Sequence, residues 1–239
     1  MRVRIKRQDG PDLPPYWAVF DYEKTEKETV AGILEHLNYR DDLTDITGKK
    51  CRRIQWECGC LQKMCGGCAM VIDHRPGLAC NTFVDPSAAE ELVLSPLTKF
   101  PVVIDLRVDR SRITEDLKDA QAYLGRSGKP DPQEFLTRYQ AAKCLKCGLC
   151  LEVCPNYAGD GGRGRFYGAV AANEIYLEYV QTDDRKEPLR QAYRKHFENG
   201  CSKSLACMDI CPVGISTLST IGYMNRQGRP FRHKKEMPD

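Results

Sequence analysis

The thirteen cysteines of this 239-residue chain are grouped at spacings that suit the binding of iron and sulfide. The front group, with the spacing C-x4-C-x2-C and a distant fourth member, comprises Cys60, Cys65, Cys68 and Cys80. The next run, with the spacing C-x2-C-x2-C-x3-C-P, comprises Cys144, Cys147, Cys150 and Cys154. The first spacing is typical of plant-type [2Fe-2S] sites and the second of bacterial cluster runs. Together the two patterns predict iron-sulfur clusters.

A third cysteine run is short of one member. It comprises Cys201, Cys207 and Cys211. The complete spacing would put a cysteine at position 204, where the chain has a serine. In two-cluster bacterial ferredoxins the fourth cysteine of each run ligates the other cluster. We therefore expect one rear cluster on Cys144, Cys147, Cys150 and Cys211. The other rear cluster would take Cys154, Cys201 and Cys207.

The absent cysteine predicts the type of the second rear cluster. A hydroxyl or water oxygen is a poorer ligand for a soft metal site than a thiolate. A cubane with only three thiolates therefore readily lacks the iron at its fourth corner, and we predict one [4Fe-4S] and one [3Fe-4S] cluster. The alternative is that Ser204, or water, holds a fourth iron in a labile [4Fe-4S] cluster.

The elements around the front group indicate a small mixed domain. Val3 and Ile5 alternate with basic residues, as in a half-buried strand. Gly59, Gly66 and Gly67 would let the backbone wrap closely around a cluster. The further predicted elements are a strand at 16–22, a helix from Thr29 to Leu37, a hairpin over 69–80 with its turn at 74–77, and a strand at 91–94.

The rear half of the sequence predicts helices. Asp131, Pro132 and Glu134 have the chemistry of a helix start. The apolar residues that follow on one face are Phe135, Leu136 and Tyr139. Other helices are predicted over 169–179 and 189–197. We therefore expect an α+β chain: a β-grasp plant-type ferredoxin domain over 1–102, then an all-α bacterial-ferredoxin-like domain over 103–239.

Charge and composition narrow the function. The formal net charge is only +3, which argues against a nucleic-acid partner. The basic segment 229–235 could touch a partner or an anionic membrane, or simply be solvated. We expect no membrane span, because no run of eighteen apolar residues occurs, and no signal peptide. So many thiols indicate a reducing compartment and hence residence in the cytoplasm.

Several chemically active residues remain outside these groups. Cys51 and Cys58 are interpreted as ordinary structural thiols rather than as a redox pair or a substitute ligand. The glycine-rich segment 159–168 lacks the G-K-[ST] ending of a phosphate loop and is not expected to bind nucleotide. We expect four scattered histidines to be surface or loop residues: His36, His74, His196 and His233.

With these groups placed, the chain resembles the iron-sulfur subunit of succinate dehydrogenase or fumarate reductase. Beyond the cysteines, the resemblance includes the segment from Leu94 to Ser111, which links the two domains in that family. The resemblance also implies a helix over 113–124. One departure is Gly59-Cys60-Leu61, where family members usually have Ser-Cys-Arg. A serine or arginine there would raise the potential of the front cluster.

The resemblance implies a non-catalytic subunit that relays electrons from the FAD of a flavoprotein through [2Fe-2S], [4Fe-4S] and [3Fe-4S] to quinone or haem b in a membrane anchor. It implies a place in the tricarboxylic acid cycle or anaerobic respiration, with the subunit held peripherally on the cytoplasmic face of the cell membrane. Residues near the quinone would be Pro155, Asn156 and Ser202. No residues of this chain suggest a catalytic site.

Three other interpretations stay open. The first is a relay for a different flavoprotein, although such subunits usually carry a cysteine-rich C-terminal extension that is not seen after Cys211. The second is a free ferredoxin-like carrier, which would be monomeric with its clusters intact. The third is a zinc or disulfide scaffold with no redox role, which metal analysis would reveal.

Overall fold

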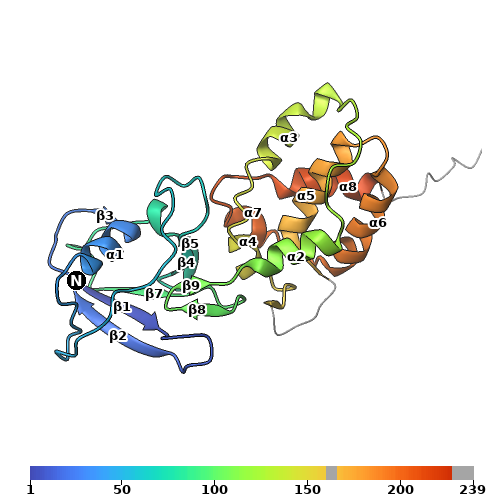
Figure 1. Ribbon diagram of the computed structural model, residues 1–239. Coiled ribbons are helices and arrows are strands. Elements are labelled where there is room, and N and C mark those ends of the chain that lie inside the picture. Colours follow the sequence, from blue (N-terminus) through green and yellow to red (C-terminus); the bar gives the residue numbers. More distant parts are fainter. Residues whose placement is uncertain (160–165, 228–239) are drawn as a thin grey trace, which may run out of the picture.

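The computed structural model describes residues 1–159 and 166–227 and shows two lobes, a front lobe of strands and a rear lobe of helices (Figure 1). The five-stranded front sheet has the order β2-β1-β7-β4-β5. Its strands are β1 (Arg2–Arg7), β2 (Tyr16–Asp21), β4 (Ala69–Ile72), β5 (Arg75–Leu78) and β7 (Glu91–Ser95). β1 pairs in parallel with β7, whereas the other pairs are antiparallel. The predicted front strands are therefore confirmed.

Helix α1 (Val30–Asn38) completes the front core. The Thr29 hydroxyl accepts a hydrogen bond from the Gly32 amide at 3.1 Å, as expected of an N-cap. The buried face of α1 carries apolar side chains at helical spacing, including Ile33, Leu34 and Leu37. Smaller elements complete the lobe: β3 (Glu28–Thr29), η1 (Ala79–Asn81), β6 (Phe83–Val84), β8 (Val102–Ile104) and β9 (Arg107–Val108).

The hairpin turn is tighter than predicted. Asp73 and His74 form it with left-handed φ values of 45° and 65°. The predicted turn at 74–77 is therefore wrong, because Arg75–Leu78 forms strand β5. Pro76 is tolerated in that strand because β5 lies at the edge of the sheet.

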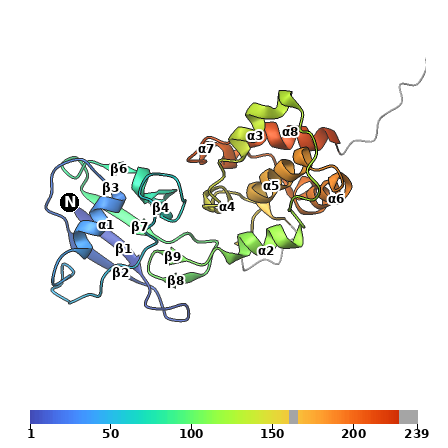
Figure 2. The same ribbon diagram turned by 45° about the horizontal axis from the view of Figure 1, so that its top comes forward.

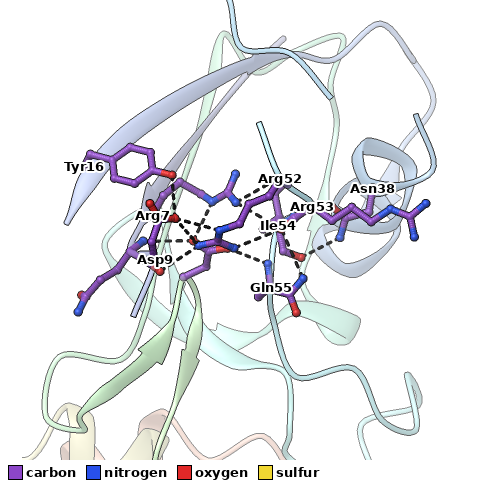
Figure 3. Close-up of polar contacts among 10 residues, drawn as sticks. Arg7, Asp9, Tyr16, Asn38, Arg52, Arg53, Ile54 and Gln55 are labelled. Atoms are coloured by element: carbon purple, nitrogen blue, oxygen red, sulfur yellow. Dashed lines mark hydrogen bonds and ion pairs between the residues drawn. The ribbon is translucent and has the colours of Figure 1, made fainter. Parts of the chain in front are cut away.

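A buried ion pair fastens the β8–β9 turn to the front sheet. The Arg7 Nε donates to Asp105 Oδ1 at 2.8 Å, and both side chains are fully buried. Arg52 donates to the same carboxylate at 2.6 and 2.8 Å. Figure 3 shows Arg7 and Arg52 converging, with Asn38 bonded to the backbone of Ile54 at 2.7 and 2.8 Å. These contacts hold residues 52–55, which lead into the front cysteine loop.

The rear lobe is built around one buried helix, α5, which lies among the others in Figure 2. Its helices are α2 (Ser111–Asp119), η2 (Pro132–Glu134), α3 (Phe135–Ala141), α4 (Leu149–Glu152), α5 (Gly168–Gln181), α6 (Lys186–His196), η4 (Glu198–Gly200), α7 (Ala206–Asp209) and α8 (Thr217–Gln227). Side chains on every side of α5 are buried, because α2, α3, α4, α6 and α8 all pack against it. No helix in the described part of the chain is long and apolar enough to cross a membrane.

Two features of the rear lobe differ from the sequence expectations. Helix α2 ends at Asp119 rather than 124, and Gln121 has a left-handed φ of 50°. His196 is 3 % exposed and stacks on Tyr167 at 4.1 Å between ring centroids, so its expected surface position is wrong.

The other described histidines are His36, half-buried on α1, and His74, exposed in its turn. His233, the basic segment 229–235 and most of the glycine-rich segment 159–168 lie outside the described residues.

Candidate iron-sulfur sites

The front cysteines lie on a coiled loop and a short helical turn beside it. Residues 58–68 contain no helix, and left-handed φ values at Leu61, Lys63 and Gly66 (54°, 60° and 74°) tighten the path. Five backbone amides point at the sulfurs of this group. They are Gln62 N and Met64 N on Cys60, Cys60 N and Gly67 N on Cys65, and Cys80 N on Cys68, at 3.2 to 3.5 Å.

These amides prepare the group to hold iron. The amides of Gln62 and Met64 lower the pKa of Cys60 to about 7, because they stabilise its thiolate. Burial raises the pKa of Cys68 to about 12. An iron ion would hold that buried thiol deprotonated regardless, as metals do for coordinating thiols. The donor set therefore fits a [2Fe-2S] cluster, with backbone hydrogen bonds to its sulfur ligands.

The rear cysteines surround two neighbouring cavities. The lining of the first cavity includes Cys144, Cys147, Cys150, Cys207 and Cys211. Burial raises the pKa of Cys144 to about 11 and that of Cys150 well above its usual value. A largely apolar pocket lined by buried thiols suits a group that binds them as thiolates, and the α4 helix and the loop after α7 bring them together.

The second cavity has a volume of ≈ 320 Å³ and contains the position of the missing cysteine. Its sulfur-bearing lining residues are Cys154, Cys201 and Cys207. Ser204 lines the same cavity. Ser202 and Asn156 also line it, and the Ser202 hydroxyl donates a hydrogen bond to Asn156 Oδ1 at 2.6 Å. Pro155 does not line this cavity. The arrangement fits a cluster with three thiolates and one oxygen-bearing corner.

All thirteen cysteines are free of disulfide bonds, so their thiols are available as ligands. Within residues 1–159 and 166–227, no group of three or more His, Cys, Asp or Glu side chains has the arrangement expected of a site for a single metal ion.

Cys51 and Cys58 have different surroundings. The Cys51 thiol lies 3.5 Å from the carbonyl oxygen of Lys49, beside the Arg52 network. The exposed Cys58 thiol lies 3.7 Å from Glu35 Oε1. Neither contact joins the two thiols to each other, and the interpretation of both as structural residues stays a prediction.

Two cations beside the cysteine loops escaped the sequence analysis. Lys99 donates to the carbonyl oxygen of Cys154, and Arg110 donates to that of Cys147 at 3.2 Å. Both belong to the linking segment Leu94 to Ser111, which the sequence analysis treated only as a connection. Each of these side chains is close to a backbone carbonyl of a rear site only in the folded chain, so no pattern in the sequence could have identified them.

The fold and the sites define an iron-sulfur protein with a front [2Fe-2S] domain and a rear two-cluster domain. Residues 2–115 match the family described as 2Fe-2S iron-sulfur cluster binding domain, and residues 140–215 match the 4Fe-4S dicluster domain. The chain is 30% identical to the succinate dehydrogenase iron-sulfur subunit of Bacillus subtilis (strain 168), over 95% of this chain and 91% of that protein. The chain therefore belongs to the family of succinate dehydrogenase and fumarate reductase iron-sulfur subunits.

Further relatives agree. The fumarate reductase iron-sulfur subunit of Haemophilus influenzae is 25% identical, with 92% of this chain and 88% of that protein covered. A chain of the Mycobacterium smegmatis Sdh1 complex in the apo form has the same fold, with a TM-score of 0.69, 22% identity and coverage of 95% and 94%. The predicted fold class and the iron-sulfur cofactors are confirmed.

Proposed function

We propose that this subunit carries electrons one at a time between the FAD of a flavoprotein and quinone or haem b in a membrane anchor. When bound, the clusters supply one-electron redox chemistry, in the order [2Fe-2S], [4Fe-4S], [3Fe-4S]. Each step moves one electron, with no bond made or broken in the protein. The residues of this chain would hold the clusters and set their spacing.

The proposed ligands follow the three groups of cysteines. The [2Fe-2S] cluster takes Cys60, Cys65, Cys68 and Cys80. The [4Fe-4S] cluster takes Cys144, Cys147, Cys150 and Cys211. The [3Fe-4S] cluster takes Cys154, Cys201 and Cys207. We propose domain limits of 1–102 and 103–239; the β8–β9 hairpin spans this limit, and its Asp105 packs with the front lobe against Arg7.

The observation that carries the proposal is that the three sites lie in series. A methyl group added to Gly66, in the front loop, would lie 2.7 Å from the Cβ of Cys147, so the front site touches the first rear site. Cys207 lines both rear cavities, so these two also abut. A chain of adjoining sites suits a relay, whereas a storage or structural role needs no such order.

The outer rear cavity is the proposed quinone end. Leu205 and Leu218 line it and are 40% and 53% exposed, so two large apolar side chains lie open to solvent at this cavity. Exposed apolar side chains suit contact with a partner better than a free carrier. Asn156 and Ser202 line this cavity and Pro155 adjoins Cys154, and these are the residues we place near the quinone. We propose that the subunit lies peripherally on the cytoplasmic face of the membrane, with this cavity against the anchor.

Electron paramagnetic resonance (EPR) on the anaerobically purified complex tests the function. The expected result is a [3Fe-4S] signal in the oxidised state that disappears on reduction, together with a [2Fe-2S] signal that develops on reduction. Metal analysis should find about nine irons per chain, the sum for these three cluster types. Zinc in their place would refute the cluster assignment, and a monomeric cluster-loaded chain in cell extracts would favour the free carrier.

A further inference from the structure

One guanidinium group joins the front cysteine loop to the first rear site. Arg110 Nη1 donates to the carbonyl oxygens of Gly66 at 2.8 Å and Cys147 at 3.2 Å. Arg110 Nη2 donates to the carbonyl oxygen of Gly67 at 3.3 Å and pairs with the Glu57 carboxylate. Gly66 and Gly67 lie between two proposed ligands of the front cluster, and Cys147 is a proposed ligand of the next.

The packing around this contact leaves little room for movement. Arg110 is only 15% exposed. A methyl group on Gly66 would lie 2.7 Å from the Cβ of Cys147 and 3.1 Å from the carbonyl oxygen of Leu145. A methyl group on Gly148 would lie 3.0 Å from the Phe100 ring and 3.7 Å from the Arg110 Cδ. The two loops therefore meet backbone to backbone, and the fork-shaped guanidinium spans the seam between them.

The charges at the seam nearly balance. Arg110 carries a fixed positive charge, and its partner Glu57 is 45% exposed. Removing either residue would leave the other charge beside the cluster loops. A positive charge near a cluster favours its reduced form, and a negative charge opposes it.

We propose that Arg110 is a positioning residue for electron transfer, which fixes the front cluster loop against Cys147 and, with Glu57, sets the potential of the front cluster. The inference rests on the proposed function, because it requires Cys65, Cys68 and Cys147 to be cluster ligands. The electron passes between the clusters themselves, and Arg110 neither gains nor loses a proton or an electron.

The test is an EPR-monitored redox titration of the purified complex. In Arg110→Met the negative charge of Glu57 is uncompensated. The equilibrium constant for reduction of the front cluster should therefore fall roughly tenfold, which lowers its potential by ~59 mV for one electron. In Glu57→Gln the shift should have the opposite sign, and it should be smaller because Glu57 is half exposed. Arg110→Lys keeps the charge but loses the fork, so it should hold the potential while broadening the front-cluster signal.

Two controls accompany these variants. Arg107→Met removes an exposed cation from neighbouring β9, which lines the same surface hollow as Glu57 and Arg110 but donates no hydrogen bond to the cysteine loops, so it should shift the front potential less than Arg110→Met does. The [3Fe-4S] potential is an internal control, because Arg110 makes no bond within that site. The [4Fe-4S] cluster, contacted only through Cys147, should shift less than the front cluster.

The outcomes separate the two levels of the proposal. Shifts of the same sign in Arg110→Met and Glu57→Gln, or an equal shift in Arg107→Met, would overturn the role of Arg110 while leaving the relay intact. Absence of the [2Fe-2S] signal from the unaltered complex would overturn both. If Arg110→Met assembles no front cluster, the other two variants decide. An unchanged front-cluster potential in Arg110→Lys together with a raised potential in Glu57→Gln supports the proposal. Any other pair of results refutes it.

Discussion

At the scale of single residues, the ligand atom that a side chain offers determines which cluster a site can hold. Ser204 lines the outer rear cavity, between Lys203 and Leu205, whose φ values of 60° and 59° are left-handed. The side chain at position 204 ends in a hydroxyl oxygen, where the complete cysteine run would supply a thiolate.

Replacing Ser204 with Cys should convert the outer site toward [4Fe-4S] and lower its potential, because a fourth thiolate adds negative charge. EPR of the oxidised complex should show the [3Fe-4S] signal reduced or lost. Ser202→Cys, two residues away and bonded to Asn156, is the matched control and should leave that signal in place. An unchanged signal in Ser204→Cys would show that position 204 does not face the missing iron.

The buried Asp105 predicts a pH dependence of stability. Burial alone would raise its pKa, but hydrogen bonds from Arg7 and Arg52 outweigh burial and hold the pKa below its usual value. The stabilisation is therefore complete above the unfolded-state pKa of about 3.9 and is lost as the pH falls through the folded-state pKa. Asp105→Asn should destabilise the front lobe by about 3–5 kcal/mol at neutral pH, because it leaves Arg7 buried and uncompensated.

The measurement for Asp105→Asn is the temperature at which half of the [2Fe-2S] EPR signal is lost, compared at one heating rate. Asparagine tolerates the left-handed φ of 48° at this position, so the change tests the charge rather than the turn. The exposed Asp12→Asn should show no loss. A gap between wild type and Asp105→Asn that does not narrow as the pH falls through the acid range below the usual pKa of an aspartate would contradict the assigned cause.

At the scale of elements, short helices are fixed by contacts with the linking segment. The Glu152 carboxylate at the end of α4 accepts hydrogen bonds from the Thr98 amide, the Thr98 hydroxyl and the Lys99 amide, at 2.6 to 3.1 Å. Lys99 in turn donates to the carbonyl oxygen of Cys154. Helix α4 has only four residues, so its place depends on these contacts more than on its own hydrogen bonds.

Replacing Glu152 with Ala should destabilise the rear lobe by about 1.5–3 kcal/mol, the contribution expected of hydrogen bonds to a charged group. We expect the thermal loss of the [3Fe-4S] EPR signal to move down by about 2–4 °C per kcal/mol. Glu26→Ala, in an exposed loop of the front lobe, is the control. An equal shift in both variants would rule out a specific role for the Thr98–Lys99 contact.

At the scale of the whole molecule, local patterns predicted the elements, and long-range contacts decided the rest. The capped helix α1 and the alternating strand β1 were predictable because their signals are local. Helix α8 was missed although its buried residues Thr217, Thr220, Ile221 and Met224 have helical spacing. Its Ser, Thr and Gly content has low helix propensity and obscured that pattern.

The site was predictable as far as its ligands are concerned and no further. Cysteine spacing identifies the groups because each cluster imposes its own spacing on the chain. The burial of His196 under Tyr167 depends on a residue from a distant segment, and so does the position of Arg110 between Gly66 and Cys147. Such contacts depend on how the two lobes and their helices pack, which no local pattern records.

Removing the clusters should unfold the chain unevenly. Residues 58–68 and 201–205 contain no helix or strand, so iron binding contributes most of what fixes them. After anaerobic iron chelation, hydrogen exchange should rise first in these segments, while β1 and α5 keep their protection. A uniform rise across the chain would show that the clusters stabilise both lobes as one unit.

The parallel pairing of β1 with β7 has a consequence for the order in which the sites can form during translation. Because Arg2 lies opposite Glu91, β1 cannot take its place beside β7 until β7 has been made, and Cys60 to Cys80 lie between these two strands in the sequence. Cys211 shares a cavity with Cys144, so the rear sites stay incomplete until Cys211 has been made. The front site can therefore be completed earlier in translation than the rear sites.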